Sequence, residues 1–244
     1  MAKKRLDVLL VERGLAESRS QAQALVLAGR VPGHAKAGEQ VDDTADLVVE
    51  EGPRFVSRGG EKLAHALEVF GVDVTGEDCL DVGASTGGFT DCLLQAGAAR
   101  VCALDVGYGQ LYPRLREDPR VAVLERVNVR NLDCGDLPFA PSFVTCDVSF
   151  IGLEKALPPA LACARPGWRA LVLVKPQFEA GPAEVGKGGV VRDPAVHERV
   201  LEQVAAQAAS WGAEVLGIAE SGLPGSKGNR EFFLYLRAAP KSPA

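Results

Sequence analysis

The chain has 244 residues, enough for one domain of medium size and a second, small one. Hydrophobic residues make up 47% of it, so a packed core is expected, and the net charge of −5 excludes a uniformly basic coat for nucleic acid, although not a local basic patch. The charged N-terminus predicts no signal peptide, and no uncharged apolar run is long enough for a membrane-spanning helix.

The first 52 residues are expected to form a small α+β domain. Residues 6–14 and 19–28 have the pattern of two short helices, and Ser18 is a good N-cap for the second, which Gly29 ends. Short strands are expected around Val31, Val41 and residues 47–49.

Charge is unevenly distributed in this part of the chain. Residues 1–36 carry seven Lys or Arg against three Asp or Glu, whereas residues 37–60 carry two against six. A basic pair of helices on a small domain indicates a surface that faces phosphates. A solvated helical face is the alternative, and composition alone does not decide between them.

A linker is predicted over residues 53–60 from Pro53 and the pair Gly59-Gly60. Apolar residues then recur at helical spacing up to Phe70, so a helix is expected to begin at Lys62. A cation at a helix start opposes the helix dipole. Lys62 is therefore a candidate functional residue, with chance placement on the surface as the alternative.

Residues 61–240 alternate strand and helix patterns, which predicts a doubly wound α/β sheet. The last two strands are separated only by residues 221–230, too few for a parallel crossover, so the last strand should run antiparallel. We predict a Rossmann-like sheet of seven strands with one antiparallel strand, as in methyltransferases rather than nicotinamide dehydrogenases. The expected strands are 79–83, 101–105, 121–125, 142–147, 169–175, 214–220 and 231–237, and the clearest helix is 195–211.

A glycine-rich turn follows the first of these strands. The dinucleotide pattern G-x-G-x-x-G fails because Ser85 occupies its second glycine position, and the phosphate loop fails because Phe89 stands where a lysine is required. The remaining pattern, D-x-G-x-x-x-G-G, looks like the S-adenosylmethionine loop of Rossmann-like methyltransferases. A tight strand–helix turn without a ligand is the alternative. The candidate contacts to the methionine end are Asp81, Gly83, Ser85 and Gly87.

An acid on the next strand supports a nucleoside ligand. Asp105 ends that strand, where an acid would bind the ribose hydroxyls, although it could instead cap the turn before Gly107. Asn128, after the third strand, is a candidate near the adenine.

Charged residues also end other strands, at the edge where open α/β sheets bind their ligands. Asp147 and Lys175 each follow an apolar strand, and Glu231 opens the last, antiparallel one. Together with Lys62 they form a candidate catalytic set, with two ordinary salt bridges as the alternative. Phe150, shortly after Asp147, is a candidate for stacking on a target base or for a core position under the next helix.

No metal site is predicted, because the three histidines lie far apart and the cysteines form no C-x-x-C pair. Buried free thiols are expected for Cys79, Cys92, Cys102, Cys134, Cys146 and Cys163.

The pattern from Arg5 to Val31 resembles the αL-type RNA-binding module first seen in a ribosomal protein, and departs from it at Pro32-Gly33-His34. The resemblance implies that residues 1–52 bind ribosomal RNA or ribosomal subunits. The candidate contacts are Arg5, Arg13, Arg19 and Lys36.

The set Lys62, Asp147, Lys175 and Glu231 resembles the tetrad of FtsJ-type ribose 2′-O-methyltransferases, and the whole chain resembles the TlyA family, also labelled hemolysin-like. Three strings that carry the resemblance are Ser57-Arg-Gly-Gly-Glu-Lys-Leu63, Gly186-Lys-Gly-Gly-Val-Val-Arg-Asp193 and Gly228-Asn-Arg-Glu231.

This resemblance implies 2′-O-methylation of cytidine in ribosomal RNA, with S-adenosylmethionine as cofactor, in the cytoplasm. The large subunit's RNA is the expected substrate, and some members also modify that of the small subunit. Lys175 would be the general base, Asp147 and Lys62 would hold it and the hydroxyl, and Glu231 would orient a lysine. The alternatives are a membrane-active hemolysin, a non-catalytic RNA-binding protein and a small-molecule methyltransferase.

Overall fold

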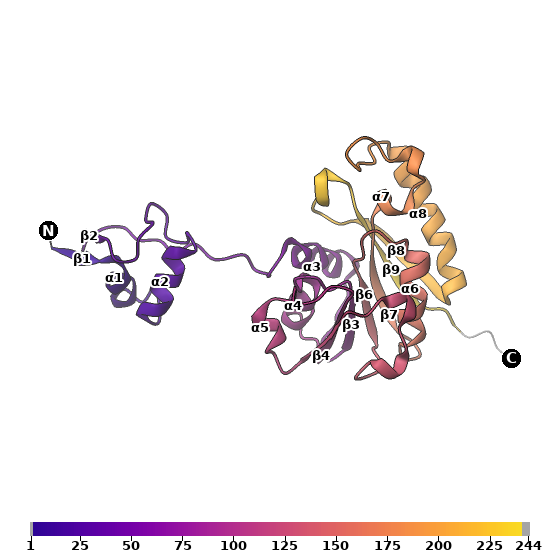
Figure 1. Ribbon diagram of the computed structural model, residues 1–244, viewed down its shortest axis with the longest axis horizontal. Helices are drawn as coiled ribbons and strands as arrows, with labels where there is room; N and C mark the ends of the chain where they lie inside the picture. The colour runs from indigo at the N-terminus through magenta and orange to yellow at the C-terminus, as the bar shows by residue number, and fades with distance from the viewer. Residues whose placement is uncertain (1, 241–244) are drawn as a thin grey trace. The chain divides into compact units, whose positions relative to one another are not determined.

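The computed structural model describes residues 2–240, which fold as two compact units divided between Arg54 and Phe55 (Figure 1). Each unit has its own hydrophobic core. The predicted linker over residues 53–60 remains a proposal. Phe55 is 1% exposed in the core of the second unit, and the Val56 N–H donates to Asp91 Oδ2 at 2.9 Å, so the second unit is held together from Phe55 onwards.

The N-terminal unit contains two helices and a two-stranded sheet. Helix α1 spans Leu6–Glu12 and α2 spans Arg19–Leu27, and the Ser18 hydroxyl accepts from the Gln21 N–H at 3.2 Å as the predicted N-cap. Strands β1 (Lys3–Arg5) and β2 (Gln40–Asp42) pair antiparallel. The strand expected at Val41 is confirmed, but those at Val31 and 47–49 are wrong, because Val31 and Leu47 enter the core from irregular backbone.

The second unit is built on a seven-stranded sheet in the order β5-β4-β3-β6-β7-β9-β8. Strand β9 runs antiparallel to both of its neighbours and the other pairs are parallel, which confirms the predicted sheet. The strands are β3 (Asp78–Val82), β4 (Arg100–Asp105), β5 (Val121–Glu125), β6 (Phe143–Cys146), β7 (Arg169–Val174), β8 (Ala213–Glu220) and β9 (Phe232–Ala238).

Helices cover both faces of this sheet, as Figure 1 shows. Helices α3 (Arg58–Phe70), α4 (Gly88–Gln95) and α5 (Pro113–Arg116) pack on one face, and α6 (Leu153–Ala162) and α8 (Pro194–Ala208) pack on the other. Helix α7 (Pro176–Glu179) follows β7 directly. Short 3₁₀ turns are η1 (Val129–Asn131), η2 (Cys134–Asp136), η3 (Pro182–Glu184), η4 (Ala209–Trp211) and η5 (Ser226–Gly228).

Two expectations about this unit are corrected. Helix α3 begins at Arg58, so Lys62 lies in its second turn and not at its start. Cys134 and Cys163 form a disulfide between η2 and the end of α6, so only the remaining four cysteines are buried free thiols. The sequence showed no signal for this pair, because the residues are 29 positions apart and belong to no repeated spacing.

Candidate functional site

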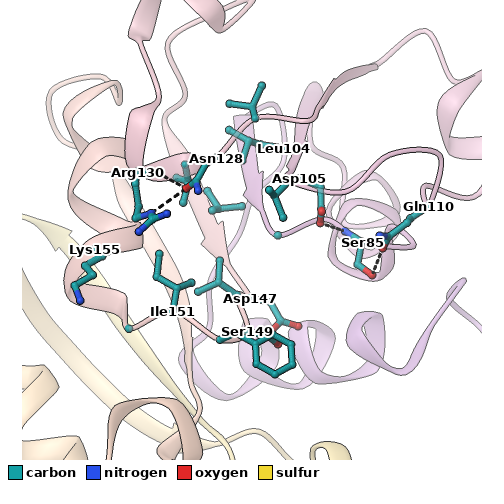
Figure 2. Close-up of a pocket in the computed structure, with 18 residues that line it drawn as sticks. Ser85, Leu104, Asp105, Gln110, Asn128, Arg130, Asp147, Ser149, Ile151 and Lys155 are labelled. Atoms are coloured by element: carbon teal, nitrogen blue, oxygen red, sulfur yellow. Dashed lines mark hydrogen bonds between the residues drawn. The ribbon is translucent and has the colours of Figure 1, made fainter.

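A cavity of about 660 Å³ opens at the carboxyl ends of β3, β4 and β6 (Figure 2). The strand-order reversal between β3 and β6 lies here, which is where open α/β sheets bind ligands. Its polar lining includes Ser85, Asp105, Asn128 and Asp147, and Gly83 lines it as well. Apolar side chains that also line the cavity include Leu104, Val127, Val129 and Ile151.

Gly83 lets the glycine-rich turn pass close to the end of β6. Its φ is +84°, and a Cβ added there would lie 2.4 Å from the carbonyl oxygen of Asp147. Only glycine fits a position that combines this backbone conformation with so close an approach. Gly83 lines the cavity, and its predicted contact with the methionine end of a cofactor stays a prediction.

Asp105 is tied to the same turn. Its carboxylate accepts hydrogen bonds from the Ser85 N–H at 2.7 Å and the Gly107 N–H at 2.6 Å. Asp105 therefore caps the turn, as the alternative expected, and also lines the cavity, while its contact with a ribose stays a prediction. Asn128 also lines the cavity, and its Oδ1 caps η1 by accepting from the Arg130 N–H at 3.1 Å.

Asp81 and Gly87 do not line the cavity, contrary to their expected position. Asp81 is fully buried beneath the turn, where its carboxylate accepts from the Thr90 hydroxyl at 2.7 Å and the Thr145 hydroxyl at 3.1 Å. Burial raises the pKa of Asp81 to about 7, against the opposing effect of those two hydroxyls. Gly87 is packed against Leu115 and precedes α4.

This burial predicts a pH-dependent stability. Between about pH 4 and pH 7 the unfolded chain releases the Asp81 proton while the folded chain retains it, so the contribution of this group falls as the pH rises. An asparagine cannot ionise. The melting temperature of Asp81→Asn relative to the parent should therefore be higher at pH 8 than at pH 5. A difference that is the same at both values would contradict the buried, raised acid.

The four candidate catalytic residues separate into two ion pairs. Lys62 Nζ lies 2.6 Å from Glu231 Oε2, and both side chains are buried. Lys175 Nζ lies 2.5 Å from Asp147 Oδ1 and also donates to the Ser149 hydroxyl at 3.0 Å. The sequence predicted that these residues lie at one edge of the sheet. It did not predict which lysine pairs with which acid.

A second cavity of about 250 Å³ joins these pairs to the glycine-rich turn. Lys62, Asp147 and Ser85 all line it, and Asp147 and Ser85 line the larger cavity too. Ser57, Arg58 and Gly59 also line it, although no functional role was predicted for them from the sequence. Their string was recognised as part of the family resemblance, but nothing in its spacing located it beside the turn.

Phe150 lies on the loop that leaves β6, and it lines the larger cavity. Its side chain is 91% exposed and its φ is +66°, an unusual conformation for a residue with a bulky side chain. The exposure rules out the core position that was the alternative. Its ring centroid lies 5.1 Å from that of Phe178.

The predicted RNA contacts of the N-terminal unit have different environments. Arg5 and Arg19 both bind the buried carboxylate of Asp7, at 2.9 and 3.1 Å, and remain about half exposed. The Arg5 hydrogen bond, with those of Gln23 and Arg19, holds the pKa of Asp7 well below its usual range. Arg13 donates to the carbonyl oxygens of Ala45 and Asp43, and Lys36 is exposed.

Within residues 2–240, no group of three or more His, Cys, Asp or Glu side chains is placed to hold a metal ion. A search of the same residues finds no helix with the length and apolar character that a membrane span requires.

Two family models match the chain, the FtsJ-like methyltransferase over residues 55–238 and the S4 domain over residues 4–31. A 16S/23S rRNA (cytidine-2′-O)-methyltransferase TlyA of Mycobacterium tuberculosis is 49% identical over 239 residues, which cover 96% of this chain and 89% of the relative. A solved structure from Streptococcus thermophilus that carries a hemolysin label is 45% identical, has a TM-score of 0.76, and is matched over 100% of this chain and 90% of its own.

A more distant structure shares the fold alone. It is a Burkholderia thailandensis N-methyltransferase with bound S-adenosylhomocysteine, at 17% identity and a TM-score of 0.52 over 75% of this chain and 79% of its own. The sheet order, the family models and the close relatives agree. The chain therefore belongs to the TlyA family of FtsJ-like methyltransferases and carries an S4 domain in its N-terminal unit.

Proposed function

We propose that this chain transfers a methyl group from S-adenosylmethionine to the ribose 2′-hydroxyl of a cytidine in ribosomal RNA. The observation that carries the proposal is the Lys175–Asp147 ion pair, whose acid lines both the ligand cavity and the smaller cavity beside Lys62. The relative that is 49% identical is named for this reaction.

The cavity residues fit S-adenosylmethionine in size and chemistry. The Asp105 carboxylate is an acceptor suited to ribose hydroxyls, and the apolar wall that includes Leu104 and Val129 suits an adenine ring. Gly83 and Ser85 would lie at the methionine end. Asp81 and Gly87 would act indirectly, by fixing the backbone of the turn. When bound, the cofactor supplies an electrophilic methyl group.

The chain's own residues would accept the proton of the 2′-hydroxyl and would position that hydroxyl. Lys175 in its neutral form would accept the proton of the 2′-hydroxyl, and Asp147 and Ser149 fix the position of its nitrogen. Lys62, held by Glu231, would orient the hydroxyl from the side of the smaller cavity. Methyl transfer is an in-line displacement, so positioning of this kind supplies much of its rate.

We propose that the RNA is bound by the S4 domain and, beside the cavity, by Phe150. Arg5, Arg13, Arg19 and Lys36 would contact phosphates, and ribosomal RNA or a ribosomal subunit would be the partner. Because the proposed substrate belongs to the ribosome, we propose that the protein acts in the cytoplasm. Large-subunit RNA is the primary substrate proposed, with small-subunit RNA as the second.

The direct test incubates the purified chain with S-adenosylmethionine and with separated small and large subunits from a strain that lacks the gene. Mass spectrometry of the nucleosides should find 2′-O-methylcytidine in the RNA of at least one subunit, and comparison of the two identifies the substrate. Absence of the product on subunits and on free RNA would overturn the proposal. Leakage of lipid vesicles, tested in parallel, would favour the membrane-active alternative.

Removing the Asp105 carboxylate should weaken cofactor binding. We expect Asp105→Ala to raise the Kd for S-adenosylmethionine by about 10- to 100-fold, the range of a hydrogen bond to a charged group. Isothermal titration calorimetry measures it. Glu125→Gln is the matched control, because Glu125 is the residue beside Asp105 in register on β5 and does not line the cavity. An unchanged Kd for Asp105→Ala would remove Asp105 from the site.

Phe150 is proposed to stack on the target base after the nucleotide leaves its helix. Stacking is worth roughly 1–3 kcal/mol per base, so Phe150→Leu should lower turnover by about 5- to 100-fold. Its melting temperature should stay unchanged, because the side chain is 91% exposed. Full turnover by the variant would show that the ring does not act on the substrate.

A further inference from the structure

Residues 186–193 and 228–230, two segments that carry the family resemblance, have no role in the reaction as described so far, yet one side chain joins them. Asn229 is 2% exposed, and its Oδ1 accepts from the Val191 N–H at 3.0 Å. Its Nδ2 donates to the carbonyl oxygens of Gly189 at 2.9 Å and Ser226 at 3.2 Å. The amide of Asn229 therefore fixes both loops to each other.

The loop that Asn229 closes lies over a catalytic candidate. The Gly225 N–H donates to the Asn229 carbonyl oxygen at 2.8 Å. A Cβ added to Gly225 would lie only 1.9 Å from Glu231 Oε1, so the backbone of this turn is in direct contact with the carboxylate. Glu231 is itself 2% exposed and binds Lys62. Movement of the turn would therefore release the side chain that holds Lys62.

The partner loop is anchored independently. The carbonyl oxygen of Val191 accepts from Nε2 of the buried His197 on α8, at 3.1 Å. Asn229 thus links the turn over Glu231 to a segment that is already fixed to a long helix. This arrangement makes Asn229 the connection between the α8 side of the fold and the Lys62–Glu231 pair.

We propose that Asn229 is a positioning residue for methyl transfer, which keeps the Glu231 carboxylate against Lys62 by fixing residues 225–229. The proposal rests on the proposed function for its effect on turnover. Its structural part, the immobilisation of Lys62, does not depend on the substrate and has a readout of its own.

The first experiment measures the accessibility of Lys62 to a small amine-acylating reagent such as acetic anhydride, by peptide mass spectrometry. Labelling should be slow in the parent and at least about fivefold faster in Asn229→Ala, because Lys62 loses a fixed partner. Gly225→Ala should show the same increase by displacing Glu231, and its φ of −71° suits alanine. Arg230→Ala is the control, since Arg230 is exposed and its ion pair is with Glu220.

The second experiment measures methylation at saturating RNA and 15 °C. Asn229→Ala and Gly225→Ala should lower kcat by about tenfold with the KM for S-adenosylmethionine unchanged, while Arg230→Ala keeps the parent kcat. Circular dichroism melts establish whether each variant is folded. If Asn229→Ala is not folded, the comparison of Lys62 labelling and kcat is made with Gly225→Ala.

Lys62 labelling within twofold of the parent in both variants would overturn the proposal. A fall in kcat that is accompanied by an equal rise in the KM for S-adenosylmethionine would also overturn the proposal. So would a fall in kcat that disappears at 15 °C, because either result would show a general loss of stability. If the parent methylates no RNA, the proposed function fails, and the labelling comparison alone still decides whether Asn229 holds the pair.

Discussion

Lys175→Ala should lower kcat for RNA methylation by about two to four powers of ten, the usual contribution of a general base. The proposed reason is that Asp147 and Ser149, which line the larger cavity, fix the Lys175 nitrogen, which would accept the 2′-hydroxyl proton. The variant should fold and should bind S-adenosylmethionine with the parent Kd, because Lys175 does not line the larger cavity. Single-turnover methylation and calorimetry measure the two quantities.

Lys175→Arg tests whether Lys175 acts as a general base or only as a fixed positive charge. Arginine stays protonated at any working pH, so it retains the charge but cannot accept a proton. We expect no rescue. Lys187→Ala, which removes an exposed lysine, is the control and should keep the parent kcat. Turnover near the parent rate in Lys175→Arg would make Lys175 an electrostatic clamp, and Lys62 would become the next candidate for the base.

Removal of the S4 domain should abolish methylation of ribosomal RNA, by at least about a hundredfold, and spare cofactor binding. The two units have separate cores, so the second should fold without the first. The truncated chain must begin at Phe55, because this residue fills the core beside α3 and Gly60 leaves room for its ring. A truncated chain that binds the cofactor and still methylates RNA normally would remove the S4 domain from substrate recognition.

Salt dependence tests the same domain without deletion. Each phosphate contact contributes about 0.7 to 0.9 to the slope of log K against log salt concentration. Lys36→Ala should reduce this slope by about one contact, and Lys36 is exposed, so the fold should not change. Arg5 and Arg19 suit this measurement less well, because they also neutralise the buried Asp7.

The strands of the second unit were predictable because buried parallel strands are continuous apolar runs separated by glycine-rich turns and helices. Their predicted ends differ from the observed ones by at most one residue. The first unit was harder. Strand β1 has only three exposed residues and no pattern of its own, and Val31 is apolar because it fills the core, not because it belongs to a strand.

The site was predictable to the level of the sheet edge and no further. Topology placed Asp105, Asp147 and Lys175 at that edge, because strand ends of one direction meet there. The burial of Asp81 beneath the turn depends on Thr90 and Thr145, which come from different elements. The pairing of Lys62 with Glu231 likewise depends on side chains 169 residues apart, a relation that spacing along the chain does not contain.

That separation has a consequence for the synthesis of the protein. Glu231 immediately precedes β9, which is inserted between β7 and β8, so Lys62 has no carboxylate partner until this last strand has been made and has entered the sheet. The unit that carries the S4 domain is complete within the first 54 residues and is made much earlier. Under the proposed function, the part of the chain expected to bind RNA is therefore synthesised before the residues that complete the Lys62–Glu231 pair.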